Sequence, residues 1–394
     1  MASFPLLPAA AQHLSFDPPV TIAQHVFWPV GFVGFSDGRH AIGKGDSTWY
    51  GTIDGGRSWT ELQSLRNFAV SEQVIPSIDG QSFHDFGTAT AVQERNGKYF
   101  SFNSSTATHF SFAPFAATIR ESLVTFRGLP QPATCGDARF AFGCPFRLVG
   151  GSVRLSDGTL VISAIVFWNA PRGNPNRTLA PEATSVVAFR ATDGVGLAWE
   201  YAGTILDAQD ASWSEEGPNE NALAVLADGA ILCVLRLDAG DGPATHPFRS
   251  YAKSISRDGG FTWSRAVALT DERGGPIGCA RPRLLTLAAG AIVLSGGRLH
   301  HGNWDTYLWL NAAGDGEVWS AHSVSYWHNS RQSNASLRFP QSVNFSASRV
   351  STSYTSLVAT GPTSGFVVYS RTEPSPSVGF ALPFRVSAKS TGIF

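Results

Sequence analysis

The sequence has few lysines, little net charge and no long apolar segment. Only four of its 29 basic residues are lysines, and these 29 are balanced by 30 acidic residues. Without a net basic field there is nothing to attract a phosphate backbone, so the composition argues against nucleic-acid binding. The longest apolar run, 160–168, is much shorter than a membrane-spanning helix, and we therefore expect no membrane span.

Cysteine is also scarce, and its spacing does not suggest a metal site. Cys135 and Cys144 bracket a short loop, whereas Cys233 and Cys279 are far apart, and no CxxC pair suggests zinc. We expect no metal and no cofactor. Buried thiols and a disulfide between Cys135 and Cys144 are both open interpretations. No signal peptide is visible, but four N-x-S/T sequons weakly favour an extracellular or secretory-pathway location.

The abundant residues indicate a protein with many turns and buried aromatic rings: 40 Gly, 23 Pro and 11 Trp. Two segments, 52–59 (TIDGGRSW) and 256–263 (SRDGGFTW), share the pattern S/T-x-D-G-G-x-S/T-W. In such a turn the aspartate can accept hydrogen bonds from backbone amides, and glycine supplies a positive φ. Weaker copies end in Trp199 and Trp319. We expect these aspartates to be structural and the tryptophans of the two close copies to be buried between strands.

A second element repeats along the chain, a hairpin of two apolar strands around a tight turn, often Asp-Gly. Six such hairpins begin near residues 30, 89, 151, 222, 283 and 354. This repetition predicts an all-β fold, a six-bladed β-propeller with four-stranded antiparallel blades, in a single domain spanning 1–394. We also expect strands from opposite ends of the chain to complete the last blade.

These turns and the six-unit count resemble the sialidase superfamily, whose Asp boxes (BNR repeats) have this pattern. The resemblance covers about residues 28–373 and implies a retaining exo-glycosidase that cleaves a terminal acidic sugar from a glycan or glycoconjugate. It further implies a tyrosine nucleophile activated by a glutamate, an aspartate acid/base and three arginines that bind the substrate carboxylate. All of these charges come from side chains, so no metal is expected to take part.

The glutamate and the nucleophile can be assigned from their surroundings. The segment GPNENAL contains Glu220 just before a hairpin strand, and Arg236 follows sixteen residues later, as in the central block of the family. The segment TSYTSLV, which contains Tyr354, resembles the nucleophile strand. The resemblance therefore implies that Tyr354 is the nucleophile, Glu220 its base and Arg236 a substrate-binding residue.

The remaining positions are assigned in the same way. Arg298, 62 residues after Arg236, matches the next family arginine, and Arg281 and Arg283 are rivals in the same repeat. Arg39, in the segment FSDGR, resembles an arginine that follows the first strand of the family.

Two aspartates also match family positions. Asp46 takes the place of the acid/base aspartate before the first Asp box, and Asp85, in the segment HDFG, resembles the aspartate of the second blade. Turn capping is the alternative role for both aspartates.

One departure from the family pattern affects the expected substrate. The family has an arginine about nineteen residues before the position of Arg39, but no arginine precedes Arg39 in this chain. Either the substrate lacks the carboxylate, or His25 or Arg39 replaces the arginine, or the site is inactive. Loss of one charge-assisted pair predicts poor turnover of common sialosides.

Two alternatives remain open. One is a polysaccharide lyase on a propeller scaffold, since lyases of uronic-acid polymers use His/Tyr pairs with arginines and this chain has ten histidines. The other is a non-catalytic carbohydrate-binding propeller, because Asp boxes specify the fold more than the function.

Overall fold

The computed structural model describes residues 12–26, 29, 31–34, 37–45, 48–63, 74–76, 82–85, 90–93, 100–112, 115–129, 146–148, 150–166, 184–194, 196–211, 214, 217–237, 249–300, 303–340, 351, 354–372 and 375–388.

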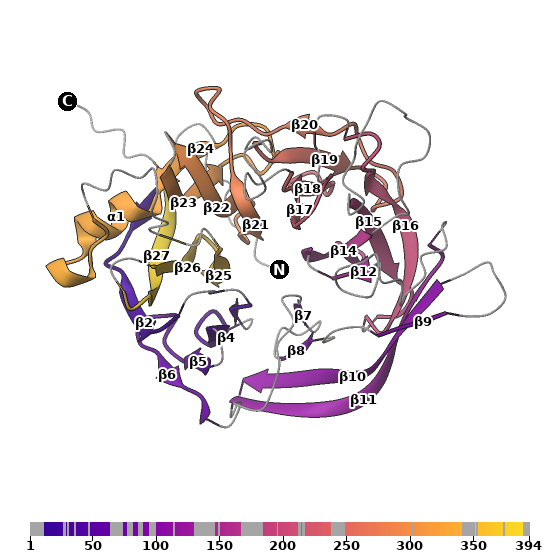
Figure 1. The fold of residues 1–394 in the computed structure, drawn as a ribbon, viewed down its shortest axis with the longest axis horizontal. Coiled ribbons are helices and arrows are strands. Elements are labelled where there is room, and N and C mark those ends of the chain that lie inside the picture. The colour runs from indigo at the N-terminus through magenta and orange to yellow at the C-terminus, as the bar shows by residue number, and fades with distance from the viewer. Residues whose placement is uncertain are drawn as a thin grey trace. The chain divides into compact units, whose positions relative to one another are not determined.

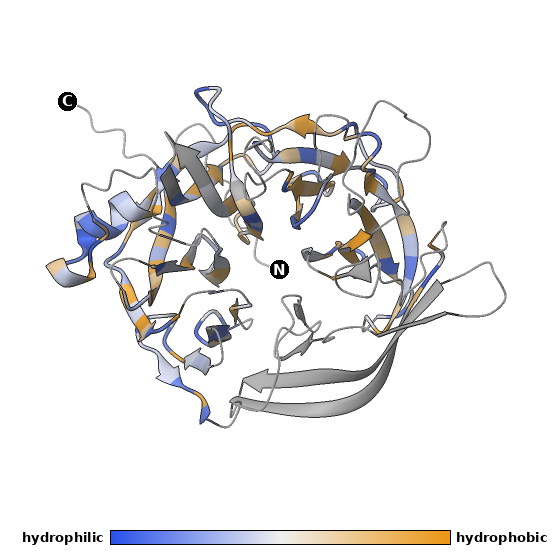
Figure 2. Ribbon diagram, viewed as in Figure 1, coloured by the Kyte–Doolittle hydropathy of each residue, from blue (hydrophilic) through white to orange (hydrophobic). Residues whose placement is uncertain are grey.

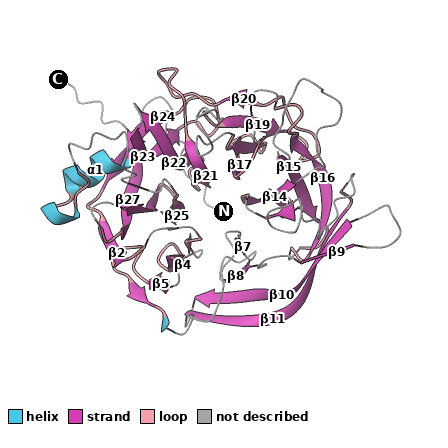
Figure 3. Ribbon diagram, in the orientation of Figure 1, coloured by secondary structure: helices cyan, strands magenta, loops and turns pink. Residues whose placement is uncertain are grey.

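The chain divides into two compact units, and each is described by itself. Unit 1 comprises residues 1–66, 226–228 and 270–394, and unit 2 comprises residues 67–225 and 229–269. Regular structure in the described parts is almost entirely β-strand, with a single α-helix among those residues (Figures 1 and 3). The predicted all-β class is therefore confirmed.

Unit 1 contains three antiparallel sheets. Two of them have four strands each, in chain order. In the third, β1 and β2 both pair with β27, so strands from opposite ends of the chain complete one sheet, as predicted. The strands of the four-stranded sheets are β3 (Val33–Gly34), β4 (Ala41–Gly45), β5 (Thr48–Thr52), β6 (Thr60–Glu61), β21 (Cys279–Thr286), β22 (Ile292–His300), β23 (Asn303–Asn311) and β24 (Ser320–Ser323). Those of the third sheet are β1 (Gln12–Phe16), β2 (Val20–Gln24), β25 (Ser356–Gly361), β26 (Ser364–Arg371) and β27 (Val378–Ala388).

Unit 2 contains one four-stranded antiparallel sheet and one sheet of ten strands. The larger sheet arises because β11 pairs in parallel with β16, with Thr125 opposite Ala198. The four-stranded sheet consists of β17 (Asn221–Val225), β18 (Ile231–Leu235), β19 (Ala252–Ser256) and β20 (Val267–Ala268). The larger sheet consists of β7 (Val74–Pro76), β8 (Ser82–Asp85), β9 (Thr90–Gln93), β10 (Phe100–Phe112), β11 (Phe115–Arg127), β12 (Phe146–Arg147), β13 (Ser152–Arg154), β14 (Leu160–Val166), β15 (Ser185–Ala191) and β16 (Ala198–Leu206).

All six predicted hairpins are present as antiparallel pairs. They are β3–β4, β9–β10, β13–β14, β17–β18, β21–β22 and β25–β26. The local signal of Asp-Gly or Gly between apolar strands was sufficient for this prediction, because the turn requires those residue types.

The cores lie where inner strands pack against those of a neighbouring sheet. All seven residues of β14 (LVISAIV) are buried, which is typical of a strand covered on both faces. The strand is mostly hydrophobic, as its colour in Figure 2 shows. In unit 2, Val161 and Ile165 of this strand belong to the same cluster as Leu223 and Ile231 of the β17–β18 hairpin.

Within unit 1, a buried histidine, His328, links the helix α1 (Val324–Arg331) to the neighbouring sheet. The Nε2 atom of His328 lies 2.9 Å from the carbonyl oxygen of Leu337, which can only accept, so Nε2 carries the proton. The Nδ1 atom then accepts a hydrogen bond of 2.6 Å from the Tyr369 hydroxyl on β26. The short helix η3 (Ala335–Leu337) supplies the carbonyl, and this chain of hydrogen bonds joins α1 to the sheet.

Four turns between the third and fourth strands of a sheet share one geometry, and we call them the aspartate turns: 54–59, 193–199, 258–263 and 315–319. In each, the indole N–H of the last residue donates to the carbonyl oxygen of the glycine three residues earlier, at 2.8–3.2 Å. The aspartate carboxylate accepts from backbone amides of its own turn. The structural role expected for these aspartates agrees with these contacts.

The burial of the tryptophans differs from the expectation for the two close copies. Trp59 and Trp263, in the turns that match the motif closely, are only half-buried. Trp199 and Trp319, in the weaker copies, are 1% and 0% exposed. The expectation of full burial was wrong for the first pair because the motif determines the turn, whereas the neighbouring sheet determines how much of the ring is covered.

Candidate functional site

Each sheet has two different ends, because antiparallel strands place alternate connections on opposite sides. In the β21–β24 sheet, the 287–291 hairpin and an aspartate turn lie at one end, which we call the turn end. The start of β21, the end of β22 and the start of β23 lie at the other end, which we call the site end. The β17–β20 and β3–β6 sheets have the same arrangement. The sequence-predicted residues can therefore be assigned to one end or the other.

Arg281 lies at the site end of its sheet, in an irregular part of β21. The ladder shifts register between Cys279, opposite Gly297, and Arg283, opposite Ser295. Ala280 has a φ of 59°, a left-handed conformation that is rare for residues other than glycine. Such bulges redirect side chains and are common beside active sites. This one places the Arg281 side chain fully inside the protein, at 0% exposure.

Tyr354, in the segment before β25, lies in the same neighbourhood. Burial and the nearby charge of Arg283 lower the pKa of Arg281 well below its ordinary value, and Tyr354 acts in the opposite direction. The Nε atom of Arg283 donates to the carbonyl oxygen of Thr355 at 3.3 Å, and the Ser295 and Thr355 hydroxyls are 2.7 Å apart. Two guanidinium groups and a phenol are thus brought together in unit 1.

Glu220 and Arg236 form an ion pair in unit 2. Arg236 Nη1 donates to Glu220 Oε2 at 2.5 Å, and both side chains are largely buried, with 10% and 14% of the Arg and Glu side chains exposed. The backbone explains the pairing: Arg236 N–H donates to the Glu220 carbonyl at 2.8 Å, and Asn219 N–H donates to the Arg236 carbonyl at 2.9 Å. These bonds extend the β17–β18 ladder beyond its last strand residues, so the sixteen-residue spacing becomes a cross-strand contact.

Neighbouring polar groups hold the loop before β17 in place. Ser163 on β14 donates to the side-chain oxygen of buried Asn221 at 2.5 Å, and Thr184 donates to the carbonyl oxygen of Pro218 at 2.6 Å. Gly217 has a φ of 74°, and a Cβ there would lie 2.3 Å from the Thr184 carbonyl oxygen. The loop that carries Glu220 is therefore fixed by both its sequence and its packing.

One buried acid was missed by the sequence analysis. Asp305 on β23 accepts hydrogen bonds of 2.8 Å from the hydroxyls of Ser323 and Ser325. Burial raises the pKa of its carboxyl group to about 6, and these hydrogen bonds act in the opposite direction. In the ladder, Asp305 stands directly opposite Arg298. An acid in the otherwise largely apolar strand NWDTYLWLN was the available signal.

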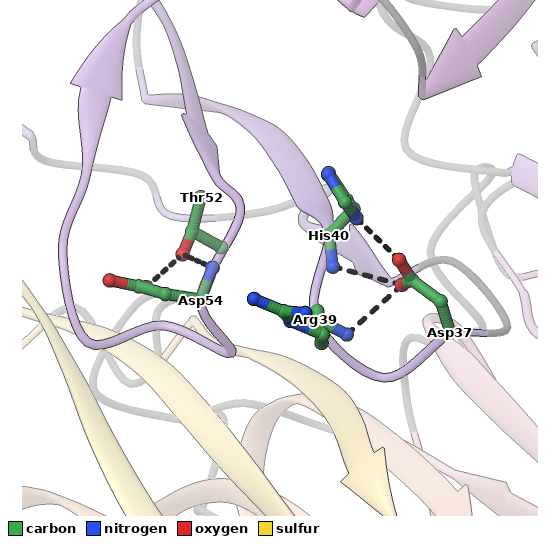
Figure 4. Close-up of polar contacts among 5 residues, drawn as sticks. All are labelled: Asp37, Arg39, His40, Thr52 and Asp54. Atoms are coloured by element: carbon green, nitrogen blue, oxygen red, sulfur yellow. Dashed lines mark hydrogen bonds and ion pairs between the residues drawn. The ribbon is translucent and has the colours of Figure 1, made fainter.

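Arg39 lies elsewhere, at the turn end of the β3–β6 sheet. Asp37 caps the β3–β4 turn by accepting from the N–H groups of Arg39 and His40, each at 3.0 Å, and pairs with the His40 ring (Figure 4). The carbonyl oxygen of Arg39 accepts from Gly55 N–H at 2.8 Å, so Arg39 lies beside the Asp54 turn. The end of β4 at Gly45 and the start of β5 at Thr48, which are paired, are at the opposite end of the same strands.

The remaining predicted residues are placed only in part. Asp46 lies outside the described residues. Asp85 is the last residue of β8, opposite Val74 and Thr108, and Arg298 is near the end of β22. The described residues contain no group of three or more His, Cys, Asp or Glu side chains arranged to hold a metal. None of the helices in the described segments is long and apolar enough to cross a membrane.

The comparisons with known proteins concern the fold. No protein-family model matches the sequence, and no curated protein matches it. Among solved structures, an α-L-arabinofuranosidase from Fusarium graminearum has a TM-score of 0.53 at 14% identity, covering 97% of this chain and 98% of its own. An α-L-arabinanase from Penicillium chrysogenum has a TM-score of 0.50 at 13% identity, with the same coverage. A Hadza microbial sialidase has a TM-score of 0.50 at 12% identity, and this chain spans 65% of its length. The chain therefore shares its all-β fold, with several four-stranded antiparallel sheets, with these structures.

Proposed function

We propose that this protein is a glycoside hydrolase that removes a terminal sugar, with its catalytic residues at the site end of a six-bladed Asp-box β-propeller. The observation that carries the proposal is the grouping of the buried Arg281 and the half-buried Arg283 with Tyr354. Support comes from the Glu220–Arg236 ion pair and from a fold shared with solved glycosidases.

In the proposed reaction, the Tyr354 oxygen attacks the anomeric carbon of the terminal sugar and Glu220 accepts the phenol proton. Asp46 protonates the leaving oxygen as the glycosidic bond breaks, leaving a covalent glycosyl-tyrosine. Asp46 then accepts a proton from water, which attacks the anomeric carbon with overall retention, and Glu220 returns its proton to the departing Tyr354 oxygen, which restores the phenol. A phenol is a poor nucleophile at neutral pH, because its ordinary pKa is about 10, so a base is required.

We assign an acidic sugar as the first candidate substrate. A carboxylate bound beside Arg281 would offset the like charge of Arg283, which contributes to the lowered pKa of Arg281. Planar guanidinium groups also match a carboxylate with two parallel hydrogen bonds. Arg236 and Arg298 are assigned as further substrate-binding residues on the family resemblance, together with Asp85.

A neutral furanoside is the second candidate. It is favoured by the absence of any arginine before Arg39, which removes one carboxylate-binding residue of the sialidase pattern. Two of the similar solved structures are named as enzymes of α-L-arabinofuranosides and arabinan. A substrate without a carboxylate would not require the missing arginine.

The test is a turnover screen with a nucleophile variant. Fluorogenic sialosides, related nonulosonides, uronides and α-L-arabinofuranosides are compared for the native protein, Tyr354→Phe and the control Tyr326→Phe, whose ring is exposed on α1. We expect Tyr354→Phe to lower kcat at least about 1,000-fold, because the attacking oxygen is lost, and Tyr326→Phe to have no effect. Equal turnover by both variants would exclude Tyr354 as the nucleophile. A product absorbing in the ultraviolet, formed without uptake of water, would instead indicate a lyase.

A further inference from the structure

A pocket lies at the turn end of the β3–β6 sheet, between this sheet and the sheet that contains β27. Its volume is about 580 Å³, within the range of pockets that bind small molecules. Its walls come from the β3–β4 turn, the Asp54 turn, the segment after β1 and the β25–β27 strands. Arg39, which the family resemblance assigned to the substrate site, is one of its lining residues.

Three arginines line this pocket, from three separate segments: Arg39, Arg57 and Arg385. All three are exposed, and none of them forms an ion pair with another residue that the structure describes. The side chain of Arg39 extends toward the Asp54 turn and away from the Asp37 carboxylate (Figure 4). The charges of these three side chains are thus available to a ligand.

The two aspartates of the lining do not neutralise these arginines equally. The Asp54 carboxylate already accepts from the amides of Arg57 and Ser58, at 2.9 and 3.0 Å. It also accepts from the hydroxyls of Ser58 and Thr52, at 2.7 and 2.8 Å. The oxygens of Asp54 are therefore committed to the turn, and Asp17 is the one other carboxylate among the described lining residues.

The walls of the pocket are held by close backbone contacts. Gly38 has a φ of 67°, and a Cβ there would lie 2.6 Å from the carbonyl oxygen of Thr360. A Cβ on Gly365 would lie 2.5 Å from the carbonyl oxygen of Val358. Because no larger side chain fits at Gly38, the β3–β4 turn approaches the sheet that contains β27 closely here. The contact at Gly365 lies within that sheet and fixes the packing of β26 against β25.

We propose that this pocket binds a saccharide that carries a carboxylate or sulfate group. Arginine forks recognise such oxyanions with charge-assisted hydrogen bonds. The hydroxyls of Thr360 and Ser364 offer partners for sugar hydroxyls, and the rings of Pro18 and Pro383 offer apolar surface for the faces of a sugar ring. The pocket lies beside the β25–β26 turn, whereas Tyr354 and Thr355, the latter in contact with Arg283, precede the opposite end of β25, so the pocket is separate from this part of the proposed site.

The test measures equilibrium binding by calorimetry, without turnover, so its result does not depend on the proposed glycosidase activity. The probe is glucuronate, compared with glucose and with sodium sulfate. We expect the native protein to bind glucuronate, and Arg57→Gln combined with Arg385→Gln to weaken that binding at least about ten-fold. Asp17→Asn removes an opposing carboxylate and should tighten binding about two- to three-fold. Arg273→Gln, an exposed arginine outside the pocket, is the matched control.

Three results would overturn the proposal. Unchanged glucuronate affinity in the double variant would show that these arginines do not form the site. Equal affinity for glucose would show that no anion is recognised, and equal affinity for sulfate would show that the sugar contributes nothing. Since the substituted side chains are exposed, thermal unfolding of each variant should match that of the native protein, and this confirms that only binding has changed.

Discussion

The two ends of the β21–β24 sheet differ in the environment of their polar side chains. At the turn end, Asp315 accepts from Glu317 N–H and from the Asn311 side chain, and the Trp319 indole donates to a backbone carbonyl. At the site end, a fully buried arginine lies close to a second arginine, and the buried carboxyl of Asp305 has a raised pKa. The same strands thus connect an end where polar groups are hydrogen-bonded within a turn to an end where burial of charged groups costs free energy.

This difference separates what stabilises the fold from what the fold is used for. Buried charges beside like charges reduce stability, and replacing them with apolar groups of similar size is often neutral or favourable. A chain that retains them needs them for something other than folding. Substitutions at the turn end should therefore lower stability and leave turnover unchanged, whereas substitutions at the site end should do the opposite.

The largest effect is expected for a buried tryptophan of an aspartate turn. Trp199→Ala removes a ring that is 1% exposed and packed on Phe126, and should lower the free energy of unfolding by about 3–5 kcal/mol. Trp263→Ala, in the half-buried copy, should cost about half as much, because less apolar surface is lost. Urea unfolding of the two variants measures both values. Equal losses would show that the indole hydrogen bond, which both rings make, matters more than burial.

The second prediction concerns Arg281. Arg281→Met keeps the volume but removes a buried charge beside Arg283, so the free energy of unfolding should stay within about 1 kcal/mol or rise. In the same variant, kcat/KM for whichever substrate the screen identifies should fall about 100-fold, since a charge-assisted contact is lost. Arg273→Met, in an exposed turn, is the control for both measurements. A large loss of stability with unchanged kcat/KM would make Arg281 a structural residue.

The third prediction concerns the pH dependence of stability at Asp305. Burial raises the pKa of Asp305 to about 6, above the ordinary value of 3.8. The folded state therefore binds its proton more tightly, so the group favours folding below about pH 4 and this contribution is lost as pH rises through 6. Asp305→Asn should be more stable than the native protein by about 2 kcal/mol at pH 7.5, and the advantage should disappear at pH 4.

Unfolding of both proteins across this pH range gives the difference directly and cancels the effect of other titrating groups. Those groups include His322 and His328, whose pKa values burial lowers to about 4. A variant that is less stable at every pH would mean that the hydrogen bonds from Ser323 and Ser325 outweigh the cost of the buried carboxylate.

The hairpins and the aspartate turns could be predicted from the sequence because their signals are local. Glycine and aspartate at fixed positions specify a turn whatever surrounds it. The segment around Arg39 shows the limit of such signals, because Asp-Gly-Arg fits both a hairpin turn and a substrate-binding motif. The register of β3 with β4, with Val33 opposite Ile42, places Asp37 and Gly38 in the turn and Arg39 beside Asp54.

The site end was harder to predict, because its geometry depends on contacts between distant strands. The spacing of Glu220 and Arg236 became an ion pair because the β17–β18 ladder continues past both strands. In the sequence Arg298 matched the family position, and Arg281 and Arg283 were its rivals. The irregular stretch of β21 that buries Arg281 arises from its pairing with β22, and no local pattern announces it.

The smallest effect is expected for the carboxylate of an aspartate turn. Asp258 accepts from Thr262 through both its hydroxyl and its amide, which lower the pKa of Asp258 to about 2. Its contribution is therefore complete above about pH 4 and is lost only as pH falls through 2, the reverse of Asp305. Because the turn is exposed, Asp258→Ala should lower the free energy of unfolding by only about 1 kcal/mol at pH 7. Turnover should be unchanged, and Asp210→Ala, in another exposed turn, is the control. If Asp258→Ala instead abolished turnover without loss of stability, the division of roles between the two ends would be wrong.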